Sequence, residues 1–226
     1  GWISGKTKLS KAQLVLAFGA RARVASKDRF EEIRAWYPEA HIITCSTAGE
    51  ILKNEVTDDS IVLTAIQFEK TTIKTAQRDI KDSAQSEAVG ADLAKSLPSD
   101  GLAHVMVFSE GLTINGTQLV AGLLANLPKT VSVTGGLVGD GADFKLTVAG
   151  LDEPPTSGKV IVVGFYGSSL RIGYGSLGGW DAFGPDRVIT KSAGNVLYEL
   201  DGKPALELYK QYLGEKASGL PGTGLL

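Results

Sequence analysis

An internal repeat constrains the fold of this chain more than any other feature of its sequence. Two segments align without a gap when one is shifted by 90 residues. The aligned pairs are Val15 and Val105, Phe18 and Phe108, Pro38 and Pro128, Thr44 and Thr134, Gly49 and Gly139, and Glu50 and Asp140. The offset lengthens at residues 151–157, where two prolines interrupt the second copy. Two copies are fewer than a solenoid needs, so the pattern predicts a duplicated unit.

Hydrophobic periodicity predicts the same order of elements in both halves. The first half is expected to contain strand 14–19, helix 27–37, strand 41–47, a polar loop, a hairpin of strands 60–68 and 71–78, and a helix from 83 to 97. The second half is expected to contain strand 105–109, helix 116–127, strand 131–135, an extended stretch 145–151 and a hairpin of strands 160–166 and 170–174. This order predicts an α/β fold built from a duplicated βαβββ unit. We favour a layered helix–sheet–sheet–helix sandwich, although the sequence leaves open whether the halves form one sheet or two.

The repeat also divides the chain. We expect one domain over residues 1–190, with its two copies at about 14–98 and 104–180. Residues 191–226 are then a connector made of a strand and a helix. That helix is predicted to begin at Pro204, because proline suits the first turn of a helix.

Charge and cysteine content exclude several classes of function. The net charge of -2 offers no basic surface for nucleic acid or for an anionic membrane. The apolar runs are far shorter than the roughly 20 residues that span a bilayer, and the start of the sequence does not read as a secretion signal. The single cysteine, Cys45, fits a reducing compartment, so we expect a cytoplasmic protein. With two histidines far apart, we expect no zinc site and no cofactor.

Four segments at or just beyond apolar strands combine small residues with hydroxyl, amide or carboxylate groups. They are residues 44–50, 108–111, 115–117 and 134–141. Small residues let a ligand touch the backbone, and the polar side chains supply directional hydrogen bonds. The candidate ligand-binding residues are Cys45, Ser46, Thr47, Glu50, Ser109, Glu110, Asn115, Gly135, Gly136 and Asp140. The alternative is that the glycines only permit positive φ in turns and that the carboxylates are solvated.

The same segments resemble a known family. Residues 42–51, IITCSTAGEI, are similar to the GCSTAGEI signature of FIST N-terminal domains. Further similarity comes from residues 107–112, VFSEGL, from residues 134–141, TGGLVGDG, followed by Phe144, and from residues 194–205. The last stretch resembles the segment that leads to the C-terminal domain of that family. The resemblance covers nearly the whole chain.

The resemblance implies a sensory domain of signal-transduction proteins. Such domains are proposed to bind small ligands such as amino acids, and they act alone or with kinase, cyclase or chemotaxis-type output domains. Thr44 departs from the glycine common in the first motif, and Glu110 from a common aspartate, so the dimensions of the pocket are expected to differ. The sequence ends where the family enters its C-terminal domain, which suggests a fragment.

Catalysis is the first alternative, with Cys45 or Ser46 as the nucleophile of a hydrolase or amidotransferase. His41 would lie about 13 Å from Cys45 along a strand, and His104 is predicted to begin its strand at the opposite end from the exits. Nucleophile and base must lie within hydrogen-bond reach, so we expect no enzyme. A protein-interaction scaffold without a ligand is the third alternative, and it predicts that side chains fill the strand exits.

Other motifs have simpler interpretations. Residues 173–178 match G-x-G-x-x-G, but the sequence after them is a poor start for a helix, so a dinucleotide site is not expected. Asn115 begins a glycosylation sequon, although a helix N-cap is the simpler account. Trp180 and Phe183 suit either a lid over a pocket or a small satellite core. Glu50 and Asp140 suit a pair of acid and base, turn carboxylates, or contacts to a ligand ammonium group.

Overall fold

The computed structural model describes residues 9–175, 177–178 and 184–220, in two units that divide between Ile172 and Gly173. Two four-stranded sheets form the first unit. The first sheet has the order β5 (Ile61–Ile66), β1 (Leu14–Gly19), β2 (His41–Ser46), β9 (Ala149–Leu151). The second has the order β6 (Thr72–Asp79), β10 (Lys159–Tyr166), β7 (Leu102–Ser109), β8 (Ser132–Leu137). In each sheet the two strands of the strand–helix–strand unit, β1 with β2 and β7 with β8, run parallel.

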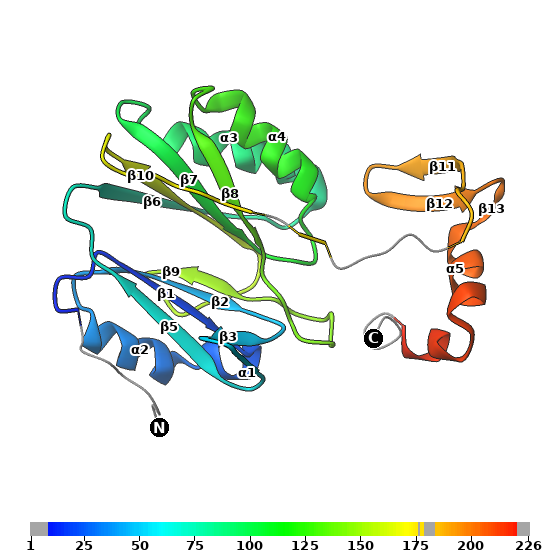
Figure 1. Ribbon diagram of the computed structural model, residues 1–226, viewed down its shortest axis with the longest axis horizontal. Coiled ribbons are helices and arrows are strands. Elements are labelled where there is room, and N and C mark those ends of the chain that lie inside the picture. The colour runs from blue at the N-terminus through cyan, green and yellow to red at the C-terminus, as the bar shows by residue number, and fades with distance from the viewer. Residues whose placement is uncertain (1–8, 176, 179–183, 221–226) are drawn as a thin grey trace. The chain divides into compact units, whose positions relative to one another are not determined.

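The sheets pack face to face, and helices cover their outer faces (Figure 1). Side chains of both sheets, among them Leu16, Ile43 and Ile161, form the core between them. Helix α2 (Lys27–Trp36) packs against the first sheet, and helices α3 (Ser86–Ser96) and α4 (Gly116–Asn126) pack against the second. The predicted helix–sheet–sheet–helix sandwich is confirmed. The central strands β1 and β10 are buried on both faces, which explains their continuous apolar runs.

The two sheets share a three-stranded core of equal topology. Strands β5-β1-β2 and β10-β7-β8 have the same order and the same relative directions. Each core gains one further strand on a different side: β9 beside β2, and β6 beside β10. A duplicated unit would give this arrangement, and the duplication itself remains a prediction. Strand β9 pairs with the outer edge of β2, whereas no strand in the described residues pairs with the corresponding edge of β8.

The pairing of β7 with β8 is shifted by one residue relative to the pairing that the sequence alignment with β1 and β2 implies. Thr44 pairs with Ala17, whereas Thr134 pairs with Met106, which lies 89 residues after Ala17. A shift of one residue turns a side chain to the opposite face of a sheet. Thr44 therefore lies on the helix side of its sheet and Thr134 on the side facing the other sheet. The predicted equivalence of these two threonines is wrong.

Neither predicted hairpin forms. Strands β5 and β6 follow one another in sequence, yet β5 pairs with β1 and β6 pairs with β10 in the other sheet. The stretch 170–174 is not a strand, because β10 already has β6 on one side and β7 on the other. The predicted polar loop instead contains a small hairpin of β3 (Glu50–Leu52) and β4 (Glu55–Thr57), and a short helix α1 (Arg21–Val24) follows β1.

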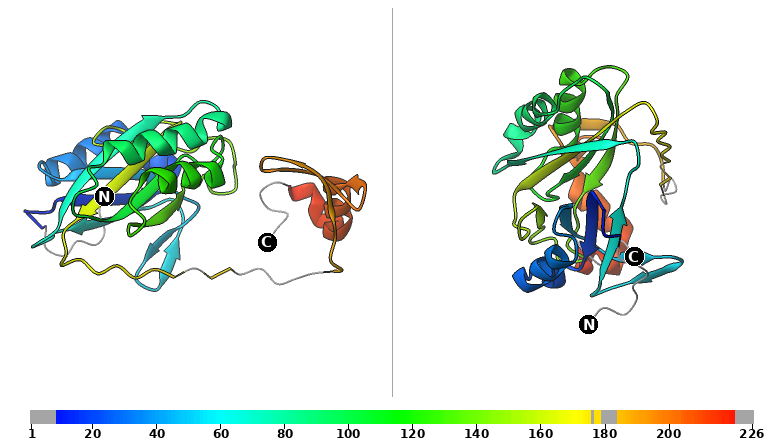
Figure 2. Two further views of the ribbon diagram at one scale, coloured as in Figure 1. Left: turned by 90° about the horizontal axis from the view of Figure 1, so that it is seen from above. Right: turned by 90° about the vertical axis from the view of Figure 1, so that its left-hand side faces the viewer.

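Helices α3 and α4 lie side by side in unusually close contact (Figure 2). A short 3₁₀ helix, Ser83–Gln85, precedes α3. A Cβ atom on Gly90 would lie 2.3 Å from the carbonyl oxygen of Leu119, and one on Gly122 would lie 2.1 Å from that of Glu87. The backbones of the two helices therefore touch at these glycines. The predicted apolar faces of both helices, including Leu93 and Leu123, are buried in the core with the second sheet.

The second unit is small. It contains a sheet of β11 (Ile189–Ala193), β12 (Val196–Leu200) and β13 (Lys203–Pro204), followed by helix α5 (Ala205–Leu213) and a 3₁₀ helix, Gly214–Gly219. Arg187 donates hydrogen bonds to Asp201, at the end of β12, and to Tyr212 of α5, and so links the sheet to the helix. The helix predicted to begin at Pro204 forms as α5, with Pro204 as its N-cap. Its role as a connector and the boundary at residue 190 stay predictions. Trp180 and Phe183 lie outside the described residues. No helix in the described part of the chain has the length and apolarity needed to cross a membrane.

Candidate functional site

A cavity of about 480 Å³ lies between the two sheets, where the parallel strands end. Both sheets and their exit loops contribute to its wall. The lining residues are Phe18, Cys45, Ser46, Thr47, Ala48, Met106, Phe108, Thr134, Gly135, Gly136, Leu137, Val138 and Gly139. This volume falls in the range of pockets that hold small molecules.

The wall of the cavity is apolar apart from a few hydroxyl groups. The rings of Phe18 and Phe108, one from each sheet, lie 6.0 Å apart between centroids at an angle of 48°. Among the described residues that line the cavity, none carries a charged side chain. Burial raises the pKa of the Cys45 thiol to about 12, so this thiol is protonated at neutral pH. The described part of the wall therefore offers a ligand apolar contacts and hydroxyl groups, but no ion-pair partner.

The edge of β8 forms part of the cavity wall. No strand in the described part of the chain pairs with the outer edge of β8, and Gly135, Gly136 and Leu137 are exposed. Gly135 has φ +146°, and a Cβ there would lie 1.9 Å from the carbonyl oxygen of Val107, so only glycine fits. A Cβ on Gly136 would have no atom within 4 Å. Gly136 pairs with Phe108, which faces the core between the sheets, so this side of Gly136 opens into the cavity.

Five of the ten predicted ligand-binding residues line the cavity, namely Cys45, Ser46, Thr47, Gly135 and Gly136. Ser46 is fully buried, and its Oγ accepts a hydrogen bond from the Val148 N–H at 3.0 Å. The Thr47 hydroxyl donates to Glu50 Oε1 at 2.6 Å. The structure thus brings the first and last motifs of the sequence together across the two sheets.

The three predicted carboxylates accept hydrogen bonds from the protein itself. Glu50 accepts from the Ser60 N–H and hydroxyl at 3.1 and 2.8 Å, in addition to Thr47. Asp140 Oδ2 accepts from the N–H groups of Lys145 and Leu146. Burial opposes the ionisation of Asp140, but these hydrogen bonds and the nearby guanidinium of Arg21 lower its pKa below the usual range. These carboxylates shape the loops around the cavity.

Glu110 organises the loop between β7 and α4. Its carboxylate accepts hydrogen bonds from three consecutive backbone N–H groups, those of residues 112, 113 and 114, at 3.1, 2.5 and 2.6 Å. It also accepts from the Thr147 hydroxyl at 3.4 Å. The Ser109 hydroxyl donates to the Glu110 carbonyl, and Asn115 accepts from the Gln118 N–H as the N-cap of α4. The predicted N-cap is confirmed.

The loop after β8 is tied to the loop after β2. The N–H groups of Gly139 and Gly141 donate to the carbonyls of Ser46 and Thr47. Arg21 of α1 adds an ion pair, because its Nε lies 2.5 Å from Asp140 Oδ1. The exit loops of the two sheets therefore form one connected rim. Arg21 was not among the predicted residues, since it lies 119 residues from its partner and belongs to no motif.

A buried histidine also reaches the cavity wall. His104 is 1% exposed, and its Nδ1 lies 2.7 Å from Ser132 Oγ and its Nε2 lies 2.8 Å from Thr134 Oγ1. Burial lowers the pKa of His104, so its ring is neutral at pH 7. Of these residues, Thr134 lines the cavity. The sequence carried no signal for this contact beyond the alternation of residues along β8.

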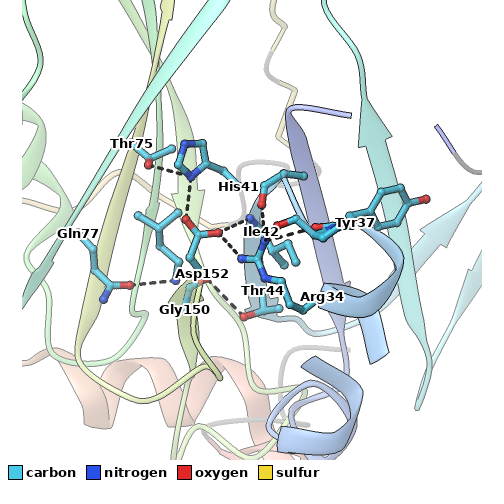
Figure 3. Close-up of polar contacts among 12 residues, drawn as sticks. Arg34, Tyr37, His41, Ile42, Thr44, Thr75, Gln77, Gly150 and Asp152 are labelled. Carbon is cyan, nitrogen blue, oxygen red and sulfur yellow. Dashed lines mark hydrogen bonds and ion pairs between the residues drawn. The ribbon is translucent and has the colours of Figure 1, made fainter. Parts of the chain in front are cut away.

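The other histidine belongs to a polar cluster at the start of β2 (Figure 3). The Asp152 carboxylate lies between the ring of His41 and the guanidinium of Arg34, at 2.7 Å from each. It also accepts from the Ile42 N–H at 2.8 Å. Thr75 Oγ1 lies 3.5 Å from the same His41 nitrogen that contacts Asp152, so the three groups do not form a proton relay through opposite ring nitrogens.

This cluster predicts a pH dependence of stability. The hydrogen bond to Asp152 raises the pKa of His41 and outweighs the effect of its partial burial. The raised pKa stabilises the fold fully below the unfolded pKa of about 6.5, and this contribution is lost as the pH rises through the folded pKa. We expect His41→Gln to cost about 0.5–1 kcal/mol more at about pH 5.5 than at about pH 8.5, measured by urea unfolding. An equal cost at both pH values would contradict this assignment.

A family model described as the FIST N domain matches residues 13–203 of the chain. No curated protein matches the chain. In the residues that the structure describes, no group of three or more His, Cys, Asp or Glu side chains could hold a metal ion.

Proposed function

Because the chain belongs to the FIST N domain family of sensory domains in signalling proteins, we propose that it binds a small ligand in the cavity between its sheets. The observation that carries this proposal is the cavity itself, which joins the two predicted glycine-containing motifs at the exposed edge of β8. Glycine at position 135 is required by the close approach of β7, and Gly136 leaves the space beside it open. A ligand can therefore reach backbone groups as well as side chains.

Binding fits the site better than catalysis. The protonated thiol of Cys45 is a poor nucleophile, because the thiolate is the reactive form. The fully buried Ser46 hydroxyl holds the Val148 N–H. His41 contacts Asp152, and His104 contacts two hydroxyl groups of its own sheet. These contacts support a sensor rather than a hydrolase.

A ligand-free scaffold is also less well supported. That alternative predicted strand exits filled by their own side chains, whereas a cavity of about 480 Å³ lies there. Its wall is mainly apolar, and such a cavity gains stability when an apolar group displaces weakly held water.

The ligand we propose is an amino acid or a related small metabolite. Its apolar part would pack against Phe18, Met106 and Phe108, and its polar groups would meet the Thr47 and Thr134 hydroxyls and the backbone of β8. Glu50, Ser109, Glu110, Asn115 and Asp140 then act by holding the loops in place, as their hydrogen bonds indicate.

The proposed signal passes from the rim to an output partner. Ligand binding would order the connected loops after β2 and β8, and the change would continue through the connector helix α5. The partner we propose is a kinase, cyclase or chemotaxis-type protein in the cytoplasm. The proposed function involves no binding to nucleic acid or to a membrane.

A thermal-shift screen of the whole chain against amino acids and common metabolites tests this function. A ligand at about 100 times its Kd adds roughly 2.7 kcal/mol to the stability, which should raise Tm by about 5–10 °C. We expect at least one saturable shift. If every compound leaves Tm unchanged, the proposed function fails and the scaffold alternative gains support.

A further inference from the structure

We propose that the cavity selects a ligand by an uncharged apolar body with one hydrogen-bonding group, and that this group pairs with the Thr134 hydroxyl. The inference rests on the proposed function and names the chemical class of its ligand. For an amino acid, the body is an uncharged side chain, and the ammonium and carboxylate groups remain at the mouth of the cavity.

The exclusion of charge follows from the surroundings of the cavity. Its lining carries no charged side chain among the described residues, so a buried charge would find no partner there. The charged groups of the surrounding loops are already engaged. Glu50 is held by Thr47 and Ser60, Glu110 by backbone N–H groups, and Asp140 by N–H groups and Arg21. Arg21 also pairs with Asp143. Contact with the apolar wall removes water from part of a ligand, and a charge that loses water without gaining an ion-pair partner is costly.

Thr134 is the hydroxyl best placed to recognise a polar group. Ser46 is fully buried and its Oγ accepts from the Val148 N–H, while the Thr47 hydroxyl donates to Glu50 and is left only to accept. Thr134 pairs in register with Met106, and both face the core between the sheets. Its Oγ1 contacts His104 at 2.8 Å, and the described residues give it no second hydrogen bond. One donor or acceptor capacity of this hydroxyl is therefore left for the cavity.

His104 lets this hydroxyl serve either role. A neutral imidazole carries one N–H, so it donates at one ring nitrogen and accepts at the other. When Nε2 carries the proton, it donates to Thr134, Nδ1 accepts from Ser132, and the Thr134 O–H is free to donate. When Nδ1 carries the proton, Thr134 donates to Nε2, and its oxygen is free to accept from a ligand. Ser132 can accommodate both tautomers because a hydroxyl group rotates.

Three indole probes of similar size test the inference on the whole chain. Indole is uncharged with one N–H donor, and 1-methylindole lacks the donor. Indole-3-carboxylate carries its charge directly on the ring, with no linker that would let the charge stay at the mouth while the ring enters. Dissociation constants would be measured by NMR titration, with the amides of Gly135 and Gly136 reporting on the cavity. We expect indole to bind about fivefold more tightly than 1-methylindole, the value of one neutral hydrogen bond, and at least about tenfold more tightly than indole-3-carboxylate.

The variant Thr134→Val removes the hydroxyl at nearly constant volume. It should weaken indole about fivefold and leave 1-methylindole unchanged, so that the two probes bind equally. The matched control Thr72→Val changes an exposed threonine of β6 outside the cavity lining and should leave both constants unchanged. The inference is overturned if Thr134→Val weakens both probes equally, or if neither does.

The outcomes separate this inference from the proposed function. Equal binding of indole and indole-3-carboxylate overturns the neutral cavity, while the sensory function stands. A ligand found in the metabolite screen, together with no binding of any indole probe, also overturns the inference alone. No shift in the screen and no binding of the probes overturns both.

Discussion

Replacing Glu110 with alanine will lower the free energy of unfolding by about 3–5 kcal/mol. The side chain is only 4% exposed, and its two oxygens accept from three backbone N–H groups and from the hydroxyl of Thr147. Alanine leaves these donors without their acceptor in the interior. Each unsatisfied buried donor costs about 1–3 kcal/mol, and water that enters the space recovers part of the loss.

Urea unfolding of the variant and of a matched control measures this effect. Glu69→Ala removes the same atoms from an exposed position in the turn between β5 and β6, and we expect a change within about 0.5 kcal/mol. Glu110→Gln should fall between the two, because the amide keeps one accepting oxygen. A cost for Glu110→Ala no larger than that for Glu69→Ala would show that this carboxylate does not organise the loop.

Gly122→Ala is expected to destabilise the fold by about 2–4 kcal/mol, although alanine is the better helix former. A Cβ at this position would lie 2.1 Å from the Glu87 carbonyl oxygen and 3.0 Å from the Ala91 backbone nitrogen. Both are backbone atoms, so the clash can be relieved only if α3 and α4 move apart. That movement opens the core that both helices share with the second sheet.

The control lies in the same helix. A Cβ on Gly116 would have no atom within 4 Å, so Gly116→Ala should leave stability unchanged or raise it by up to about 1 kcal/mol. Thermal unfolding of both variants distinguishes the close helix contact from a general effect of glycine replacement. If Gly122→Ala raises Tm as Gly116→Ala does, the close contact between α3 and α4 is not present in solution.

The sequence predicts the layers of this fold well because the buried faces of helices and strands appear in it as periodic patterns of apolar residues. The apolar faces of α3 and α4 and the continuous apolar runs of β1 and β10 show which sides of these elements are buried. The sequence does not predict which strands pair. The turn at Glu69-Lys70 looks the same whether the flanking strands form a hairpin or enter different sheets, as β5 and β6 do. The hairpin at 50–57 was missed because Ile51 and Val56 are largely exposed and give no buried pattern.

The sequence likewise predicts one part of the candidate site and not the other. The motifs predicted Thr47, Gly135 and Gly136, which line the cavity, because small residues and hydroxyls at strand exits leave space and hydrogen-bonding groups there. They did not predict the directions of the carboxylates, because those depend on how each loop folds back on its own N–H groups. The His104–Thr134 contact depends on the cross-strand register, which was one residue out in the aligned sequence.

The measurement that tests the central claim most directly is a calorimetric titration of the ligand found in the screen. It would compare the unmodified chain with Gly136→Phe, which fills the cavity from a position where a Cβ meets no atom within 4 Å. Gly116→Phe places the same side chain on α4, outside the cavity lining. We predict equal affinity for the unmodified chain and Gly116→Phe, and at least a 100-fold loss for a cooperatively folded Gly136→Phe, about 2.7 kcal/mol or more. Unchanged affinity in Gly136→Phe would contradict the claim that the ligand binds between the sheets.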